Sequence, residues 1–389
     1  TPTQIKAATG IEVSRPLTQP GKIYFKDRIL FINEVGKGIH IIDNTDPSSP
    51  EPLSFLAIPG NFDLSILGNT LYADSFVDLI AFDISNLPDI KEVNRIERLF
   101  NHSNSLGFNY ISQQGILTDW KMVNTVSIEE EECTKTLQYW GGMYYDRGIA
   151  VTANSSFSAQ ASLAPNNSTG IGGSIARFTI TNQHLYALDN YYMDVVDLTN
   201  QVSPKAKNEI QLTWQAETLF PRGNTLFVGT RSGMYIYNVT NAATPVKISQ
   251  LEHVRSCDPV VVEGDYAYVT LRDGTACGGY SNQLDVINIS DLAKPVLEKT
   301  YAMKNPHGLG IDNGILFICD GSDGLKIYDA ADVHKITDNQ LAHYDKINAF
   351  DIIPYQHVAM VIGSDGLYQY DYSDVKSIKL LSKLSIVKP

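Results

Sequence analysis

Apolar and polar residues alternate along much of this chain in short runs, and one such run recurs seven times. Each copy is five residues long, is mostly apolar, and ends on Asp or Asn, which is typical of a β-strand that runs into a turn. The seven copies are residues 39–43, 79–83, 193–197, 234–238, 284–288, 325–329 and 367–371. This repetition predicts an architecture built from similar units rather than one irregular domain.

The spacing of the copies predicts how each unit is built. Asp43 and Asp83 lie 40 positions apart, and the other uninterrupted junctions have nearly the same spacing. Asp83 and Asp197 lie 114 positions apart, so this junction holds a long insertion. A period near 40 residues made of short strands is the signature of radial β-repeats with four strands per blade. We therefore predict an all-β, seven-bladed β-propeller of four-stranded antiparallel blades, with one long insertion between repeats 2 and 3.

The second repeat shows the expected order of strands within a blade. Residues 62–67 fit an innermost strand, and residues 68–69, Gly-Asn, fit a hairpin turn that needs positive φ. Residues 70–75 and 78–84 fit the second and third strands. After an Asn-Leu-Pro turn, residues 91–96 fit the outer strand.

The rest of the chain divides around these repeats. Residues 1–21 are polar and predict an N-terminal arm, in which residues 11–13 could add a strand. Residues 22–389 predict a single propeller domain, with an insertion at 101–174. Loops of such length in a compact fold usually carry function or are disordered. Its Gly-rich end, residues 170–173, is interpreted as a flexible approach to the next strand.

Composition narrows the classes of partner. The chain has 389 residues, 43% of them hydrophobic, which supports a large core. The net charge of -13 argues against nucleic-acid binding, because phosphate contact needs a basic face. No apolar run is long enough to span a membrane. The chain starts at Thr1 without Met, so we expect a mature or trimmed N-terminus, with any signal peptide or lipid-bearing residue upstream.

The recurring strand resembles the repeat of the LVIVD family, named for a strand such as Leu-Val-Ile-Val-Asp. The variants at 193–197, Met-Asp-Val-Val-Asp, and 284–288, Leu-Asp-Val-Ile-Asn, are close to it. The resemblance extends over the repeats from about Lys22 onward. It implies a seven-bladed propeller of the kind common among exported bacterial proteins that are often lipid-anchored. The family has no agreed enzymatic activity, so the resemblance implies no catalytic residue, and it places the chain in the cell envelope or at the cell surface.

Aligning the repeats on their first turn places charged residues near the start of the innermost strands. In a propeller these positions lie at the mouth of the central channel. The ligand-binding candidates are Asp63, Arg177, Glu217, Asp258, His307 and Asp351. Carboxylates with one His could hold a hard cation or polarise a small ligand. The acidic and basic members could equally neutralise one another across the channel. We predict no dedicated cofactor, with a central cation as the alternative.

The four cysteines allow one disulfide hypothesis. Cys257 precedes an inner strand and Cys277 lies in the loop between the second and third strands of the same repeat. Both positions fall on one face of a blade, so a Cys257–Cys277 bond is permitted, and the export that the family resemblance implies favours it. Cys319 ends a second strand and is interpreted as an inert core thiol. His40, beside Ile41 and Ile42 on a third strand, is interpreted as a packed residue.

No sequence motif indicates catalysis. There is no Gly-x-Ser-x-Gly elbow, no phosphate loop and no metal-ligand spacing such as His-x-x-x-His. We therefore predict a non-catalytic, exported or cell-surface binding module that presents the propeller face and the 101–174 insertion to a protein or glycan. The alternatives are a hydrolase or lyase with a cation at the channel mouth, and a structural scaffold of the envelope.

Overall fold

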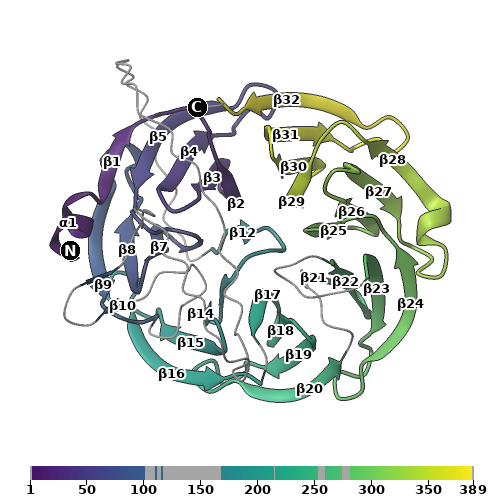
Figure 1. The fold of residues 1–389 in the computed structure, drawn as a ribbon, viewed down its shortest axis with the longest axis horizontal. Helices are drawn as coiled ribbons and strands as arrows, with labels where there is room; N and C mark the ends of the chain where they lie inside the picture. Colours follow the sequence, from purple (N-terminus) through teal and green to yellow (C-terminus); the bar gives the residue numbers. More distant parts are fainter. Residues whose placement is uncertain are drawn as a thin grey trace, which may run out of the picture.

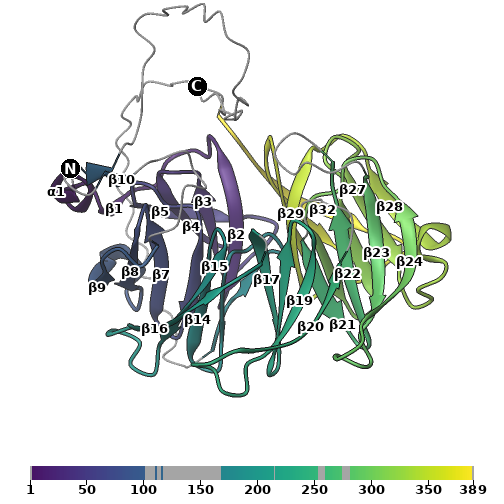
Figure 2. The ribbon, with the colours of Figure 1, turned by 60° about the horizontal axis from the view of Figure 1, so that its bottom comes forward.

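The computed structural model describes residues 2–100, 110–111, 115–116, 168–213, 215–252, 259–273 and 281–387. Within these residues, seven antiparallel sheets are arranged as blades around a central axis, with the innermost strand of each blade nearest the axis (Figures 1 and 2). The chain is therefore a seven-bladed β-propeller, as the repeat spacing predicts. None of its described helices is long and apolar enough to cross a membrane.

Each blade uses four strands that are consecutive in the sequence, counted from the channel outward. Blades 1 to 4 are β2 (Pro20–Lys26), β3 (Ile29–Glu34), β4 (Gly38–Asp43) and β5 (Glu51–Ala57); β6 (Leu64–Leu67), β7 (Thr70–Ser75), β8 (Asp78–Asp83) and β9 (Lys91–Ile96); β13 (Phe178–Thr181), β14 (His184–Asp189), β15 (Tyr192–Asp197) and β16 (Lys205–Gln211); β17 (Ala216–Arg222), β18 (Thr225–Thr230), β19 (Gly233–Asn238) and β20 (Val246–Glu252). Blades 5 to 7 are β21 (Val260–Glu263), β22 (Tyr266–Leu271), β23 (Gln283–Asn288) and β24 (Val296–Ala302); β25 (Leu309–Asp312), β26 (Ile315–Cys319), β27 (Leu325–Asp329) and β28 (Gln340–Tyr344); β29 (Ala349–Tyr355), β30 (Val358–Gly363), β31 (Gly366–Asp371) and β32 (Lys379–Ser385).

The remaining described elements are short and lie outside this four-strand pattern. They are α1 (Pro2–Ala7), β1 (Gly10–Val13), β10 (Tyr110–Ile111), β11 (Gly115–Ile116), β12 (Ile171–Gly172), and the 3₁₀ turns η1 (Leu87–Asp89) and η2 (Ile336–Asn339). Strand β1 pairs with β5 as an additional outermost strand of blade 1, so the strand predicted at residues 11–13 is confirmed.

The terminal Asp or Asn of the recurring strand has the same role in every blade. Its side-chain oxygen Oδ1 accepts a hydrogen bond from the backbone N–H two residues later, which forms an Asx turn. The seven pairs are Asp43–Thr45, Asp83–Ser85, Asp197–Thr199, Asn238–Thr240, Asn288–Ser290, Asp329–Ala331 and Asp371–Ser373, with N···O distances from 2.8 to 3.1 Å. The turn reverses the chain from the third strand toward the outer strand. This explains why each copy ends on a residue that can accept this bond.

The second blade departs from its expected strand bounds at two places, of which the smaller is the third strand β8, which ends at Asp83 rather than at residue 84. The inner strand begins at Leu64 rather than at residue 62. The backbone N–H groups of Phe62 and Asp63 instead donate to Oδ1 of Asp74, at 2.8 and 2.9 Å. A side-chain carboxylate thus replaces the ladder partner at this end of the strand.

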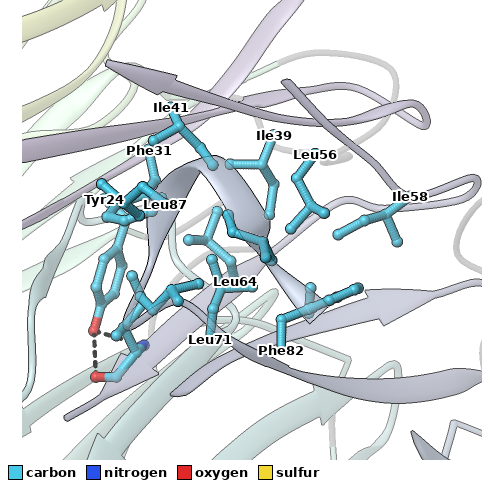
Figure 3. Packing of buried hydrophobic residues seen from close by; sticks show 14 of the residues in the cluster. Tyr24, Phe31, Ile39, Ile41, Leu56, Ile58, Leu64, Leu71, Phe82 and Leu87 are labelled. Atoms are coloured by element: carbon cyan, nitrogen blue, oxygen red, sulfur yellow. Dashed lines mark hydrogen bonds between the residues drawn. The ribbon is translucent and has the colours of Figure 1, made fainter. Parts of the chain in front are cut away.

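The hydrophobic core is divided among the interfaces between neighbouring blades. Seven clusters of buried side chains are present in the described residues, one at each interface around the ring. Figure 3 shows the cluster between blades 1 and 2, where Phe31 and Ile39 face Leu64 and Phe82. Full burial of one such side chain contributes roughly 1.5–3 kcal/mol. The ring is stabilised mainly by sheet-on-sheet packing.

The ring closes between blade 7 and blade 1 without a shared blade. Ile32 of blade 1 and Met360 of blade 7 belong to one core cluster. Asn44 and Gln369, both buried, form a reciprocal amide pair with N···O distances of 2.9 and 2.6 Å. Because blades 1 and 7 each have all four strands from their own repeat, closure depends on these side-chain contacts and on a backbone hydrogen bond from the N–H of Val387 to the carbonyl of Leu17 at 2.8 Å.

Strand β12 lies inside the ring, where Figure 1 shows it near the centre of the channel. It pairs antiparallel with the inner edge of β2, with Ile171 opposite Phe25 and Gly172 opposite Tyr24. The preceding Ser168 accepts a hydrogen bond from the N–H of Gly68 at 3.0 Å. The interpretation of residues 170–173 as a flexible approach is therefore wrong. The segment pairs there as an extra strand, and Gly170 and Gly173 have no room for a Cβ beside Tyr24 and Asp351.

Candidate binding site at one end of the channel

The channel has two ends, and the candidate residues lie at the end where the innermost strands begin. Strand β12 runs along β2 toward this end and finishes just before Ser174. The backbone N–H of Gly173 donates to the carbonyl of Ile23 at 3.2 Å, which fixes the segment at the mouth. The chain itself therefore fills part of the channel beside blades 1 and 2. We call the end where the innermost strands begin the channel mouth.

Three charged residues from neighbouring blades meet at the mouth. Nζ of Lys22 lies 2.5 Å from Oδ2 of Asp63, and the same oxygen accepts the backbone N–H of Arg177 at 2.5 Å. Burial lowers the pKa of Lys22; the Asp63 carboxylate opposes this effect, and the Arg177 charge adds to it. The guanidinium of Arg177 donates to the carbonyl of Leu188 at 2.7 Å. These contacts link blades 1, 2 and 3.

A buried carboxylate supports this group from behind. Asp74, at the end of β7, accepts the backbone N–H groups before β6 and also the amide Nδ2 of Asn61 at 2.8 Å. Asn61 in turn accepts a hydrogen bond from Nδ2 of Asn33 at 2.7 Å. Burial raises the pKa of Asp74 to about 6, although the backbone donors counter this. The network positions Asp63 toward Lys22.

Asp351 occupies a closed environment next to this group. It is fully buried on β29, and its Oδ1 accepts two hydrogen bonds from Ser174, from the backbone N at 3.0 Å and from Oγ at 3.1 Å. A Cβ built on Gly173 would lie 1.9 Å from Oδ2 of Asp351, and one on Gly308 would lie 2.4 Å from Oδ1. Only glycines allow the carboxyl group to fit between these segments. Burial raises its pKa to about 7.

The opposite side of the mouth carries a second charged group. Nε of Arg231 donates to Oε1 of Glu217 at 2.9 Å, and both side chains are partly exposed. Nη1 of Arg272 lies 3.3 Å from Nε2 of His307. Burial and the adjacent Arg272 charge lower the pKa of His307 to about 4, so its imidazole is neutral at neutral pH and accepts from the guanidinium. This group therefore consists of two guanidinium groups, the Glu217 carboxylate and one neutral imidazole.

The structure shows where most of the predicted site residues lie. Asp63 and Arg177 immediately precede β6 and β13, Glu217 and Asp351 lie on β17 and β29, and His307 precedes β25. Asp63 and Arg177 are in direct contact, whereas Asp351 is held by Ser174 instead. Asp258 and the predicted Cys257–Cys277 pair lie outside the described residues.

The cysteine and histidine interpretations that the structure describes are confirmed. Cys319 is a free, fully buried thiol, and burial raises its pKa well above the usual value. His40 is buried, packs edge-on against Phe55, and lies 2.9 Å from Oε2 of Glu34.

Sequence reasoning missed three residues that complete the site. Arg231 and Arg272 both follow directly after a second strand, β18 and β22, so aligning the repeats on the end of that strand would have found them. Lys22 stands at the aligned inner-strand position but was not selected as a ligand candidate. Its partner Asp63 is 41 positions away, and only the placement of adjacent blades brings them together.

This arrangement is suited to polar recognition. Within the described ranges, no group of three or more His, Cys, Asp or Glu side chains is placed to hold a metal ion. The carboxylates of Asp63 and Glu217 already accept hydrogen bonds from cationic side chains. Guanidinium groups bind carboxylate, phosphate or hydroxyl oxygens through their planar set of N–H donors.

The ring of blades and the charged mouth define the class of this protein as a seven-bladed β-propeller with a polar channel end. Residues 255–303 match the family model of the LVIVD repeat. The resemblance inferred from the recurring strand is thus confirmed at residues 255–303, which carry an LVIVD repeat within the propeller. No curated protein matches the sequence.

Solved structures share the fold at low sequence identity. The periplasmic gluconolactonase PpgL of Pseudomonas aeruginosa superposes with a TM-score of 0.58 at 10% identity, covering 98% of this chain and 97% of that chain. A protein from Lactobacillus plantarum gives a TM-score of 0.57 at 12% identity, with the same coverage. The computationally designed protein Ika8 gives 0.53 at 12% identity, covering 97% and 93%. At these identities the likeness concerns the fold alone.

Proposed function

We propose that this chain is a non-catalytic binding module whose protein or glycan ligand docks at the channel mouth. The observation that carries the proposal is the convergence there of charged side chains from several blades, beside the channel segment that β12 occupies. Glu217 and Arg231 are partly exposed, so an approaching ligand can reach them. The predicted insertion at 101–174 lies mostly outside the described residues, and the proposal does not depend on it.

Binding is favoured over catalysis because the acids at the mouth are already engaged. Asp63 accepts hydrogen bonds from Lys22 and from the backbone N–H groups of Leu64 and Arg177. Asp351 is enclosed between glycines and is not exposed to solvent. A general acid or base must reach the proton that it transfers, and neither side chain does so here.

The chemistry of the mouth indicates what kind of ligand would bind. Arg177 and Arg231 present planar donor forks, Glu217 is an acceptor, and His307, whose Nε2 accepts from Arg272, has Nδ1–H as a donor. Such a mixture suits a hydroxyl-rich glycan or a polar peptide loop better than an apolar ligand. The hydrolase or lyase with a central cation is the alternative, and it differs in requiring turnover.

A ligand screen tests the proposal. A glycan array and a peptide library would be probed with the full chain, and hits would be measured by isothermal titration calorimetry. We expect Arg231→Ala and Arg177→Ala to weaken a true hit at least tenfold, since a charged hydrogen bond contributes about 1.5–3 kcal/mol. Lys299→Ala, an exposed lysine on the outer strand β24, is the matched control and should bind normally.

Two outcomes would overturn this function. Hits that bind all three variants equally would move the binding surface away from the mouth. Chemical turnover of a lactone, ester or glycoside that stops on chelation and returns with metal would establish the hydrolase or lyase instead.

The proposal includes export to the bacterial envelope, with a lipid anchor upstream of residue 1, as the family resemblance implies. Fractionation of the native host with an antibody against the chain tests this directly. Recovery in the cytosolic fraction would refute the localisation and leave the binding function to be judged on its own experiment.

A further inference from the structure

Three residues with ring side chains stand at one equivalent position of the inner strands, at the channel mouth. They are Phe62 in blade 2, His307 in blade 6 and Phe350 in blade 7, and all three are partly exposed. Each lies six positions before the residue that starts the first hairpin turn of its blade with positive φ, namely Gly68, Asn313 and Gln356. We call these three residues the aromatic arc.

Two members of the arc are in contact across the interface of blades 6 and 7. The ring centroids of His307 and Phe350 lie 5.5 Å apart, with the planes tilted by 51°. The backbone N–H of Gly308 donates to the carbonyl of Phe350 at 2.8 Å, which joins the starts of the two inner strands. Tilted rings at this separation form a favourable aromatic pair. The two side chains therefore act as one surface.

Phe62 extends the arc beyond blade 1. A Cβ built on Gly36, in the turn between β3 and β4, would lie 3.7 Å from Cζ of Phe62. This turn is on the mouth side of the ring, because β3 ends opposite the start of β2. The equivalent residue in blade 1 is Gly21, where a Cβ would lie 2.6 Å from Oδ1 of Asn33. The position between the two phenylalanines thus carries no side chain.

The backbone of the arc is fixed before any ligand binds. The N–H of Phe62 donates to Oδ1 of Asp74 at 2.8 Å, and the N–H of His307 donates to the carbonyl of Cys319 at 2.7 Å. Aromatic side chains have only two rotatable bonds, so they lose little conformational entropy when a ligand covers them. A fixed surface of this kind lowers the cost of binding.

Polar side chains continue this surface from His307 toward blade 4. Nη1 of Arg272 lies 3.3 Å from Nε2 of His307. Burial lowers the pKa of Arg272, and the charge of Glu217 opposes this effect, so the two side chains interact electrostatically. Glu217 in turn accepts the hydrogen bond from Arg231. The mouth is therefore aromatic on the side of blades 6 and 7 and charged on the side of blades 4 and 5.

We propose that the ligand of the channel mouth is a glycan whose pyranose rings pack on the aromatic arc while its hydroxyl groups bind Glu217 and Arg231. This inference rests on the function proposed above and narrows its ligand to one class. A pyranose presents a face of C–H groups, which the negative face of an aromatic ring attracts. Its hydroxyl groups both donate and accept, so they suit a carboxylate next to a planar guanidinium.

Peptide ligands match only part of this surface. An apolar side chain would cover the arc but would desolvate the charged border without replacing its hydrogen bonds to water, which is unfavourable. A polar loop would use the charged border and leave the aromatic rings uncovered. The amphipathic sugar ring satisfies both parts.

A panel of oligosaccharides tests the proposal on the full chain. Neutral, N-acetylated and uronic-acid pyranose tetrasaccharides would be screened, and the tightest binder would be measured by isothermal titration calorimetry. Phe350→Leu and Phe62→Leu should each weaken this tetrasaccharide about tenfold, because they remove a ring but keep an apolar side chain. Phe350→Tyr keeps the ring and should bind within about twofold of the wild-type chain. Proton NMR should show upfield ring-current shifts of the sugar C–H groups, which Phe350→Leu should reduce.

Phe25→Leu is the matched control. Phe25 and Phe350 are both partly buried and pack against the same core cluster, so their loss should affect stability similarly. Phe25 lies near the end of β2, at the other end of the channel, with its ring 5.3 Å from that of Tyr355. Phe25→Leu should therefore bind the tetrasaccharide as the wild-type chain does. Thermal unfolding of all the variants establishes that they are folded.

Three results would overturn the inference. If no tetrasaccharide binds but a library peptide binds and requires Arg231, the function proposed above stands and the glycan does not. If a tetrasaccharide binds but both Phe350→Leu and Phe62→Leu bind it as the wild-type chain does, the sugar lies away from the arc. If neither glycan nor peptide binds, the proposed function fails and this inference fails with it.

Discussion

Ser174 donates two hydrogen bonds to a single oxygen of Asp351, from its backbone N at 3.0 Å and from its hydroxyl at 3.1 Å. The same hydroxyl accepts the backbone N–H of Leu309 at 2.8 Å. This contact ties the end of the channel strand β12 to blades 6 and 7, which lie far from it in the sequence. It explains how a segment that pairs with β2 at only two residues is held in the channel.

The glycines of the channel segment allow a matched pair of substitutions. A Cβ on Gly173 would meet Oδ2 of Asp351 at 1.9 Å, whereas one on Gly172 would meet nothing closer than 3.4 Å. We expect Gly173→Ala to lower the free energy of unfolding by about 1–3 kcal/mol, as overpacking in a close-packed interior does. Gly172→Ala should change it by less than about 1 kcal/mol. Urea unfolding of both variants measures this, and equal effects would show that the channel segment is not packed against Asp351.

Asp351 should make stability depend on pH in a defined direction. Its pKa is raised from 3.8 to about 7 by burial, so the folded state favours the protonated form. The stability contributed by protonation is complete below about pH 4 and is lost as the pH rises through about 7. Asp351→Asn cannot ionise at this position. Relative to the wild-type chain, its free energy of unfolding should therefore rise by on the order of 3 kcal/mol when the pH is raised from 4 to 8.

The exposed Asp345→Asn serves as the control for this comparison. The difference in free energy of unfolding between Asp345→Asn and the wild-type chain, measured with urea, should be the same at pH 4 and at pH 8. If the Asp351→Asn difference is also constant between pH 4 and pH 8, the buried carboxyl does not titrate in that range.

Glu34 should make the chain less stable as the pH falls, which is the opposite of the pH dependence expected for Asp351. Burial raises its pKa, but hydrogen bonds from His40 and Thr18 outweigh this and lower it from 4.5 to about 2. A lowered pKa means that the stability is present above about pH 4.5 and is lost as the pH falls toward 2. Glu34→Gln should therefore cost about 2–3 kcal/mol at pH 7 and much less at pH 2.5. Urea unfolding at both pH values measures this, with the exposed Glu51→Gln as control.

The ring closure can be tested by a double-mutant cycle. Asn44 and Gln369 exchange two hydrogen bonds across the junction of blades 1 and 7, and neither side chain is open to solvent. We expect Asn44→Ala and Gln369→Ala each to destabilise the chain by about 1–3 kcal/mol, with a coupling energy of about 1–2 kcal/mol. Additive effects in chemical unfolding would mean that the amide pair does not contribute to closure.

The strands of the second repeat show which strand bounds the local sequence pattern predicts correctly and which it does not. The expected second and outer strands have the bounds that the structure shows, Thr70–Ser75 and Lys91–Ile96. Alternation and turn residues are local signals, so they locate strands well. The inner strand starts later than expected because Asp74 binds the N–H groups of Phe62 and Asp63. That contact joins residues on different strands, and no local pattern shows it.

The sequence predicted where the candidate site residues lie, but not which side chains they contact. Aligning the repeats placed Asp63, Arg177 and Asp351 near the starts of innermost strands, where the structure has them. It could not show that Asp63 would accept from Lys22, or that Asp351 would be enclosed between two glycines. Such contacts depend on how adjacent blades are rotated against each other, which is set by packing at their interfaces.

The sequence by itself determined the number of blades, their four-strand order and the Asx turn that ends each third strand. These features depend on periodicity and on hydrogen bonds between residues two positions apart, so each repeat encodes them independently. Only the tertiary structure decided that residues 168–174 lie within the channel and that blade 1 closes on blade 7 through Asn44 and Gln369. Those outcomes join distant parts of the chain, and their energies arise from burial and steric fit after the ring has formed.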